Sequence, residues 1–463
     1  MFDQDRVKIG LVPTRRGVFK EEDALEQKIP IMEHLKGIKG DRVDFVDIDD
    51  IVKNGMLYDL NDIVKVEKKL KEEKVDAIFI PHCDFGTEEV VGKIGSVMKL
   101  PVLLWGARDI GPDDTGRRKR DTQCGLFASS KVLQRYGVKY SYIVNSEVNS
   151  SKFEEGFARF AGAVSVVKAF KTIRIAQVST RPKPFMSVMC NEDELLNRFG
   201  VEIVPVSFME LMNKVNDLAQ KGSPELSRTL EDIKSRIDCS MMKEDALKKV
   251  AALNILLMEA IKANDCTAAA IECWSLFPRA LGIAPCFTIS ELTDKGVPVA
   301  CETDIHGAIT SLMVQAAGMG RSATFFADLT IRHPENDNAE LLWHCGPFPY
   351  SLKAENSPAG MEFAMAQWEI KGGDVTVARF DSIEGKYTLF AGEAKGVKGP
   401  HTRGTYLWVE VDNWDKWEEK FIFGPYIHHV VGIHGKYARV LVESCKYIPG
   451  LQPDPIDQFG LSL

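Results

Sequence analysis

The sequence predicts an α/β protein with two doubly wound parallel-sheet domains, followed by a mostly antiparallel, barrel-like β domain. Strand and helix signals alternate over the first two thirds of the chain, and alternating strands with glycine-containing connections fill the last third. The length of 463 residues is several times that of a usual domain. We therefore expect three domains, at residues 1–170, 171–345 and 346–463.

The first domain is predicted from five short runs rich in β-branched and aromatic residues, which favour strands. Helix-period segments separate these runs. In segment 61–74, for example, Ile63, Val66 and Leu70 fall on one face of a helix. The segment 154–170 is expected to form a long helix that leads into the second domain. The five expected strands lie in RVKIGLV, VDFVDI, VDAIFI, LPVLLW and KYSYIV.

A second series of the same kind follows in TIRIAQV, VEIVPVS, CTAAAIECW, VPVACET and SATFFADL. We therefore expect a second parallel sheet, in which SATFFADL is one of the strands. From about residue 340 the pattern changes to alternating strands, in DVTVARF, KYTLFAG and TYLWVEV. These strands indicate an antiparallel barrel or sandwich, to which HHVVGIHG is expected to add a strand and residues 436–446 a helix.

The composition argues against several classes of protein. A hydrophobic content of 45% and a charged content of 27% are ordinary for a globular protein, and the net charge of −8 gives no basic face for nucleic acid. No apolar stretch reaches the ~18–20 residues that would span a bilayer, and no secretion signal is recognised. Ten scattered cysteines without a C-x-x-C pair predict neither a disulfide framework nor a zinc site. We expect a reduced, cytoplasmic protein without nucleic-acid or membrane partners.

Charged side chains follow several of the expected strands, at the edge where ligands of α/β proteins bind. Glu302 in CETDIHGAIT follows VPVA, Asp328 lies in FFADLT, and His344 ends ELLWHCG. His429 is a fourth candidate, on the opposite face of its strand from His428. Two carboxylates with imidazoles and no thiolate favour Mn²⁺ or Mg²⁺ over structural zinc.

Each of these residues also has a structural interpretation. Glu302 could lie in a solvated turn, Asp328 could cap a helix or pair with Arg332, and His344 could be a hydrogen-bonded core histidine. The occurrence of three metal-capable side chains at three successive strand ends favours a shared site.

The order of these motifs resembles that of the L-fucose isomerase/L-arabinose isomerase family. In the fucose branch the metal-binding glutamate lies in a Glu-x-Asp turn followed by a glycine, which Glu302, Asp304 and Gly307 match. The second ligand of that branch is the aspartate of a Phe-Ala-Asp triplet, matched by Asp328. The third is a histidine late in the chain, which we place at His429. The resemblance covers the whole length of the chain.

The resemblance implies a metal-dependent isomerase that moves a proton between C1 and C2 of a sugar through an ene-diol. In this interpretation Glu302 and Asp328 both bind the metal and carry protons. His429 and His344 complete the coordination, His344 because a further histidine binds metal in the arabinose branch. The expected ion is Mn²⁺, with Mg²⁺ or Co²⁺ as alternatives. The family also implies a homo-oligomer, a hexamer or a trimer, in which neighbouring subunits share sites.

Candidates for binding the sugar lie at further strand ends. VPTRR resembles the family's arginine-containing loop that faces substrate, so Arg15 and Arg16 could bind hydroxyl groups or an anionic group. Glu272 could hold a hydroxyl group, Trp274 could pack on a sugar face, and Met186 occupies the equivalent strand-to-helix turn. A solvated loop or the core is the alternative for each. The expected substrate is a monosaccharide, either fucose- or arabinose-like or a modified hexose that carries an anionic group.

Two functions of other classes stay open at this point. A nucleotide-dependent sugar dehydrogenase would suit a doubly wound first domain, but VPTRRG stands where G-x-G-x-x-G would follow the first strand. A non-catalytic cytoplasmic sugar-binding protein would suit two α/β domains, but it would not need a third, β-rich domain.

Overall fold

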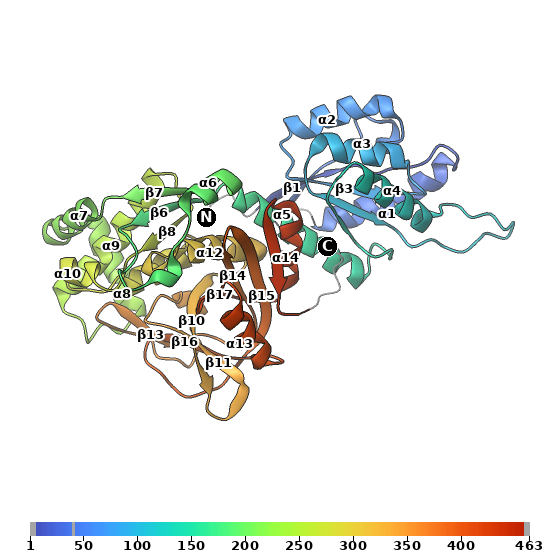
Figure 1. Cartoon of the computed structure of the whole chain (residues 1–463). Coiled ribbons are helices and arrows are strands. Elements are labelled where there is room, and N and C mark those ends of the chain that lie inside the picture. Colours follow the sequence, from blue (N-terminus) through green and yellow to red (C-terminus); the bar gives the residue numbers. More distant parts are fainter. Residues whose placement is uncertain (1–5, 39–41, 458–463) are drawn as a thin grey trace. The chain divides into compact units, whose positions relative to one another are not determined.

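The computed structural model of the chain describes residues 6–38 and 42–457. Its chain divides into two compact units, one that ends at Lys168 and one that begins at Ala169. The first unit is a parallel sheet with helices, and the second combines a smaller parallel sheet with an antiparallel barrel (Figure 1). The predicted fold class is therefore confirmed.

The first unit is built on a five-stranded parallel sheet in the order β2-β1-β3-β4-β5. All five expected strands are present: β1 (Val7–Leu11), β2 (Val43–Val46), β3 (Ala77–His82), β4 (Val102–Gly106) and β5 (Tyr140–Tyr142). The helices are α1 (Glu21–Ile38), α2 (Ile63–Glu72), α3 (Glu88–Met98), α4 (Thr122–Arg135) and α5 (Ser151–Phe170).

Helices cover both faces of this sheet because the strands are apolar on both sides. Ile78 and Ile80 of β3 belong to one buried cluster with side chains of α2, α3 and α4. Phe79, which points the other way, packs on Phe153 and Phe157 of α5, with ring centroids 6.2 and 6.0 Å away. Strands buried on both faces are typical of parallel sheets.

The second unit begins with a four-stranded parallel sheet in the order β7-β6-β8-β9. The strands are β6 (Arg174–Val178), β7 (Glu202–Val206), β8 (Ala268–Ile271) and β9 (Val299–Ala300). The helices are α6 (Glu192–Phe199), α7 (Phe208–Lys221), α8 (Pro224–Arg236), α9 (Glu244–Ala263), α10 (Leu276–Leu281), α11 (Cys286–Asp294) and α12 (Ile305–Ala317).

Six antiparallel strands then close into a barrel, because β16 pairs with both β11 and β15. The barrel strands are β10 (Thr324–His333), β11 (Asn336–His344), β14 (Asp374–Ile383), β15 (Lys386–Val397), β16 (Thr405–Glu410) and β17 (His429–His434). Three short strands extend it, β12 (Gly360–Glu362), β13 (Met365–Glu369) and β18 (Leu451–Pro455), with helices α13 (Trp414–Phe423) and α14 (Ala438–Ser444).

The expectation that SATFFADL continues the second parallel sheet is wrong. Its strand, β10, pairs antiparallel with β11 and β17 and so belongs to the barrel. Asp328 therefore lies inside a barrel strand rather than at the carboxyl end of a parallel one. A short apolar run looks the same in both settings, because both bury its side chains.

Helix α12 joins the sheet to the barrel. It packs on β8 and β9 on one side and on β10, β14 and β17 on the other (Figure 1). Every residue of α12 except Gln315 is buried, which explains why the helix lacks a polar face. Its approach to β10 requires a glycine, because a Cβ on Gly307 would lie 2.3 Å from Cε2 of Phe326.

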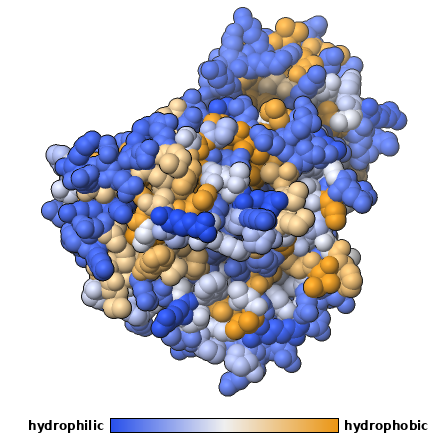
Figure 2. Space-filling view, turned by 60° about the vertical axis from the view of Figure 1, so that its left-hand side comes forward, coloured by the Kyte–Doolittle hydropathy of each residue, from blue (hydrophilic) through white to orange (hydrophobic). Residues whose placement is uncertain are grey.

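The outer surface of the protein carries no broad apolar area on the face that Figure 2 shows, where hydrophobic residues form small groups between hydrophilic ones. Among the helices of the described chain, none is both long and apolar enough to cross a membrane.

The first unit contains a histidine whose burial makes stability depend on pH. His82, at the end of β3, is fully buried, and its Nε2 lies 2.8 Å from Oγ of Ser129. Burial lowers the pKa of His82 to about 4. The unfolded chain takes up this proton near pH 6.5, whereas the folded unit does so only near pH 4, so acidification between these values favours unfolding.

We predict that this histidine costs the first unit up to about 1.4 kcal/mol of unfolding free energy per pH unit as the pH falls from 6.5 to 4. Urea denaturation of the wild type and of His82→Gln across this range measures the difference. The variant should lose less stability on acidification than the wild type. Parallel curves for the two proteins would contradict the prediction.

Candidate active site

Glu302 lies in a tight turn between β9 and α12. The turn Cys301–Thr303 places Glu302 at φ 56° and Thr303 at φ 55°, in the left-handed region that side chains other than glycine rarely adopt. Asp304 then caps α12 by accepting a hydrogen bond from the Gly307 amide at 2.9 Å. The apolar strand thus ends in a strained turn that carries a buried carboxylate.

Asp328 and His429 meet Glu302 because their strands pair. Asp328 of β10 stands directly opposite His429 of β17, so the two side chains share one face of the barrel. Nε2 of His429 lies 3.0 Å from Oε2 of Glu302 and 3.5 Å from Oδ1 of Asp328. The structure therefore brings together three residues that are far apart in the sequence.

His344, the last residue of β11, completes this group. Its Nε2 lies 3.9 Å from Oε2 of Glu302. Its Nδ1 accepts a hydrogen bond from the Cys345 amide at 2.9 Å. An imidazole nitrogen that accepts a hydrogen bond carries no proton, so the neutral His344 carries its proton on Nε2, facing Glu302.

His429 has the opposite tautomer when it is neutral. Its Nδ1 lies 2.9 Å from Oδ2 of Asp304, a carboxylate that can only accept, so the proton lies on Nδ1. The lone pair of Nε2 is then directed toward Glu302 and Asp328. A carboxylate behind a histidine is the usual arrangement at metal-binding imidazoles.

A buried ion network lies behind His429. Arg379 of β14 is completely buried and forms an ion pair with Asp304, and its Nε donates to Oδ2 of Asp381 at 2.8 Å. Nδ1 of His306 lies 2.9 Å from Oδ1 of Asp381. The guanidinium thus offsets the charge of two carboxylates that would be costly to bury alone.

The pKa shifts follow from this packing of charges. Burial raises the pKa of Glu302, but the His429 and His344 imidazoles outweigh burial and hold it at about 2. Burial lowers the pKa of His429, but Asp304 and Glu302 raise it to about 9. The pKa of Asp304 is held well below its usual range against the effect of burial, chiefly by Arg379 and His429. Glu302 is therefore ionised at neutral pH.

The group fits a divalent cation. Two of its buried atoms, Oδ1 of Asp328 and Nε2 of His344, have no hydrogen-bond partner, and Oε2 of Glu302 faces the imidazoles of His429 and His344. Asp328, His428 and His429 each offer one ligand atom, and these atoms lie within 4.8 Å of one another. Carboxylate oxygens beside an imidazole lone pair suit a hard ion such as Mn²⁺ or Mg²⁺.

His428 and Phe185 were not among the predicted site residues. His428 precedes β17, so strand alternation does not turn it away, and its Nε2 lies 4.0 Å from Oδ1 of Asp328. Phe185 packs its ring on Trp274, His428 and His429, with centroids 5.2, 5.6 and 5.3 Å away. The expectation that His428 faces away from the site is wrong, whereas Phe185 could have been found from its neighbour Met186.

The predicted sugar-binding residues of the second unit differ in their surroundings. Trp274 is half exposed and donates from Nε1 to Oε1 of Glu302 at 2.7 Å, which places it at the rim of the group. Glu272 is buried and accepts hydrogen bonds from the amides of Ser275 and Leu276, so it caps α10. Met186 is largely exposed.

Arg15 and Arg16 lie in the first unit, where each guanidinium stacks on an aromatic ring. That of Arg15 lies 3.9 Å from the ring centroid of Tyr58, and that of Arg16 lies 4.4 Å from that of Phe85. Arg15 is buried, and its Nε has no hydrogen-bond partner. Their role in binding substrate stays a prediction.

We predict that Arg379→Met lowers the unfolding free energy of the second unit by about 3–5 kcal/mol, because it removes the guanidinium that offsets the charge of two buried carboxylates. Arg332→Met is a matched control, since Arg332 pairs with Asp415 and Glu418 at the surface and should cost at most about 1 kcal/mol. Denaturant titration followed by circular dichroism measures both. Equal losses for the two variants would show that the buried network is not essential to stability.

Comparison with known proteins supports the family resemblance. Residues 10–171 match the family described as fucose/sulfoquinovose isomerase, N-terminal domain. The sulfoquinovose isomerase of Priestia aryabhattai is 26% identical over 385 residues, which cover 81% of this chain and 84% of that protein. That of Alkalicoccus urumqiensis is 27% identical over 334 residues, 70% of this chain and 73% of that protein. The chain is thus similar over most of its length to sulfoquinovose isomerases, and these similarities indicate an enzyme that interconverts an aldose and a ketose.

Proposed function

We propose that the protein isomerises a modified, anionic aldose to its ketose with the help of a divalent metal ion, and that sulfoquinovose is the first substrate to test. The names of the matched relatives support the choice of sugar. The convergence of Glu302, Asp328 and His429, with a carboxylate oxygen of Asp328 that lacks a partner, is the observation that carries the proposal.

In this proposal Glu302, Asp328 and His429 hold the ion, with Mn²⁺ as the expected metal and Mg²⁺ or Co²⁺ as alternatives. When bound, the ion would polarise the sugar carbonyl and stabilise negative charge on its oxygen. Its affinity depends on the orientation of His429, because Asp304 keeps the proton on Nδ1 and leaves Nε2 for the metal.

His344 is assigned a different role. In the tautomer that the Cys345 amide favours, Nε2 of His344 carries a proton and has no partner. We infer that this N–H donates a hydrogen bond to a substrate oxygen. Binding of the metal by His344, which the family's arabinose branch implies, would require the other tautomer and the loss of the bond from the Cys345 amide.

The carboxylates Glu302 and Asp328 are the candidate proton carriers. Aldose–ketose isomerisation removes a proton from C2 and returns one to C1, and a carboxylate beside each carbon can serve this transfer. Glu302 is ionised at neutral pH, so it begins the reaction as a proton acceptor. Its bond from Nε1 of Trp274 fixes one oxygen and leaves Oε2 to face the site.

The rim of the site would receive the rest of the sugar. Trp274 and Phe185 present aromatic surface, on which the C–H face of a sugar ring can pack. Arg15 and Arg16 are candidates for the anionic group, by their place in the loop that faces substrate in the family. The homo-oligomer of that family, a hexamer or a trimer, is part of the same proposal and can be tested by light scattering.

The direct test follows conversion of sulfoquinovose to its ketose by NMR, with protein that has been treated with EDTA and then supplied with Mn²⁺. We expect turnover only after Mn²⁺ is added, together with a higher melting temperature, since a ligand of the folded state stabilises it. Full activity of the chelated protein would rule out the metal. Turnover of L-fucose but not of sulfoquinovose would reject the anionic substrate and keep the isomerase.

A second prediction concerns the proton carriers. Glu302→Gln and Asp328→Asn should each lower kcat on the order of 10²–10⁴-fold, because an amide cannot accept the proton. Glu210→Gln, a change of an exposed carboxylate on α7, is the control and should leave kcat unchanged. In D₂O the product should carry deuterium on C1, the former carbonyl carbon. An active Glu302→Gln enzyme would remove this residue from the mechanism.

A further inference from the structure

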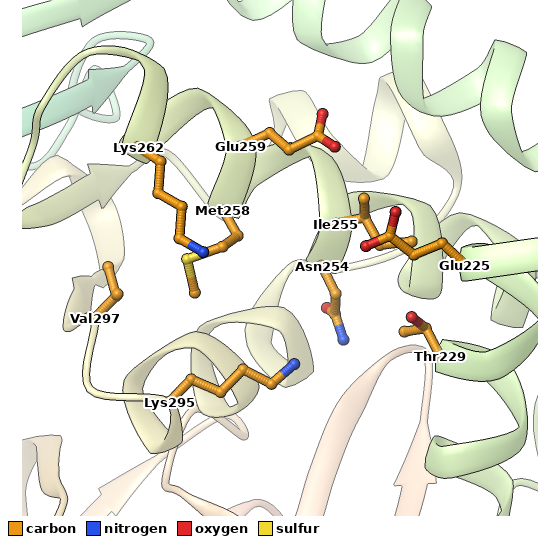
Figure 3. Close-up of a pocket in the computed structure, with 9 residues that line it drawn as sticks. All are labelled: Glu225, Thr229, Asn254, Ile255, Met258, Glu259, Lys262, Lys295 and Val297. Carbon is orange, nitrogen blue, oxygen red and sulfur yellow. The ribbon is translucent and has the colours of Figure 1, made fainter. Parts of the chain in front are cut away.

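A cavity lies in the second unit, apart from the candidate active site. Its volume is about 520 Å³, within the roughly 300–1,000 Å³ of small-molecule sites. Helices α8 and α9 and the segment between α11 and β9 enclose it (Figure 3). The cavity lies beside Val297, where β9 is about to begin, whereas Glu302 follows the end of that strand. The two sites are therefore at opposite edges of the sheet.

The innermost polar group of the cavity is an amide without a partner. Asn254 of α9 is only 3% exposed, and neither its Oδ1 nor its Nδ2 has a hydrogen-bond partner. In Figure 3 this amide and the ammonium group of Lys295 point into the same space. Buried amides are nearly always paired, because leaving one unpaired costs free energy. The amide can therefore bind a ligand group that enters the cavity and both donates and accepts hydrogen bonds.

The rest of the wall indicates a ligand without net charge. Two lysines and two glutamates line the cavity, so their charges cancel, and in the described part of the chain none of the four side chains forms an ion pair. These four residues are exposed at the rim, whereas the buried end holds an uncharged amide. The lining therefore supplies no excess of either charge to select a charged ligand, and its most buried polar group is neutral. The four residues are Glu225, Glu259, Lys262 and Lys295.

The lining also argues against a planar or phosphorylated ligand. It contains no aromatic ring for stacking and no arginine for bidentate phosphate binding. Its apolar surface comes from Ile255, Met258 and Val297, while the Thr229 hydroxyl adds a further donor and acceptor. Vicinal hydroxyl groups on a carbon ring can both donate to and accept from one amide, and can also reach lysine, glutamate and threonine side chains.

We propose that this cavity binds an uncharged, polyhydroxylated molecule of the size of a sugar ring. Asn254 accepts from one hydroxyl group and donates to its neighbour, Lys295 and Thr229 bind hydroxyl groups nearer the opening, and Met258 packs on the C–H face. The site differs from the active site in its residues, in its place at the amino-terminal edge of the sheet and in its preference for a neutral ligand.

The probe for the test is 1,5-anhydro-D-glucitol, a neutral sugar ring that cannot open to an aldehyde and so cannot be isomerised. Ligand-detected saturation-transfer NMR on the full chain should show binding. Asn254→Leu, which removes both hydrogen-bonding atoms at similar size, should weaken it at least tenfold. Lys295→Met should weaken it as well. Lys221→Met, a change of an exposed lysine paired with Asp217 on α7, should leave the affinity unchanged.

The charged comparators are D-glucuronate and D-glucosamine. Binding of these two sugars to the cavity is the binding that Asn254→Leu abolishes. Its affinity should be at least tenfold lower than that of the neutral probe. Equal affinity would overturn the assignment to a neutral ligand. Absence of any binding that depends on Asn254 and Lys295 would overturn the site itself. A smaller mass of both variants in light scattering would show that a second copy of the chain covers the cavity, which also overturns the proposal. If Asn254→Leu fails to fold, Thr229→Val replaces it.

Discussion

The arrangement of the site depends on one carboxylate, that of Asp304. It accepts a hydrogen bond from the Gly307 amide, which starts α12, and it receives His429 and Arg379 from two barrel strands. One buried side chain thus fixes the turn that carries Glu302, the direction of the imidazole opposite it and the distance between helix and barrel. Burial of the Asp304 carboxylate is tolerated because Arg379 supplies a counter-charge inside the protein.

The tautomers of the two site histidines are set by different kinds of partner, a side chain for His429 and a backbone amide for His344. An acidic partner holds the proton of His429 on the far side of the ring, whereas a backbone amide holds the proton of His344 on the near side. In their neutral forms the two rings therefore present different groups to the site, a lone pair on Nε2 of His429 and an N–H on Nε2 of His344. The two histidines are chemically the same residue type, but the hydrogen-bond partners of their Nδ1 atoms make their Nε2 atoms different.

Local sequence patterns were sufficient to predict most of the strands and to select the candidate site residues. They were not sufficient to predict which strands pair with each other. The run containing Asp328 has the same apolar character in a parallel sheet or in a barrel, so its partner strand could not be inferred from it. The opposition of Asp328 and His429 depends on a register between strands distant in the sequence. Arg379 was not predicted as a site residue, although its charge among the alternating apolar residues of DVTVARFDS was a signal of a buried ion pair. The sequence does not show which face of this strand is buried, and only the closed barrel shows that Arg379 is.

The burial of α12 on all sides has a consequence for how the second unit can be divided. The helix has no polar face that could be exposed at the boundary of a fragment. Separating the sheet from the barrel would expose one apolar half of α12 to water. The sheet and the barrel therefore share one core and are not separable modules. Any exchange of the sheet or the barrel of this protein must keep residues on both sides of α12 together, since the helix lies in the common interior of two layers and is not the outer cover of either.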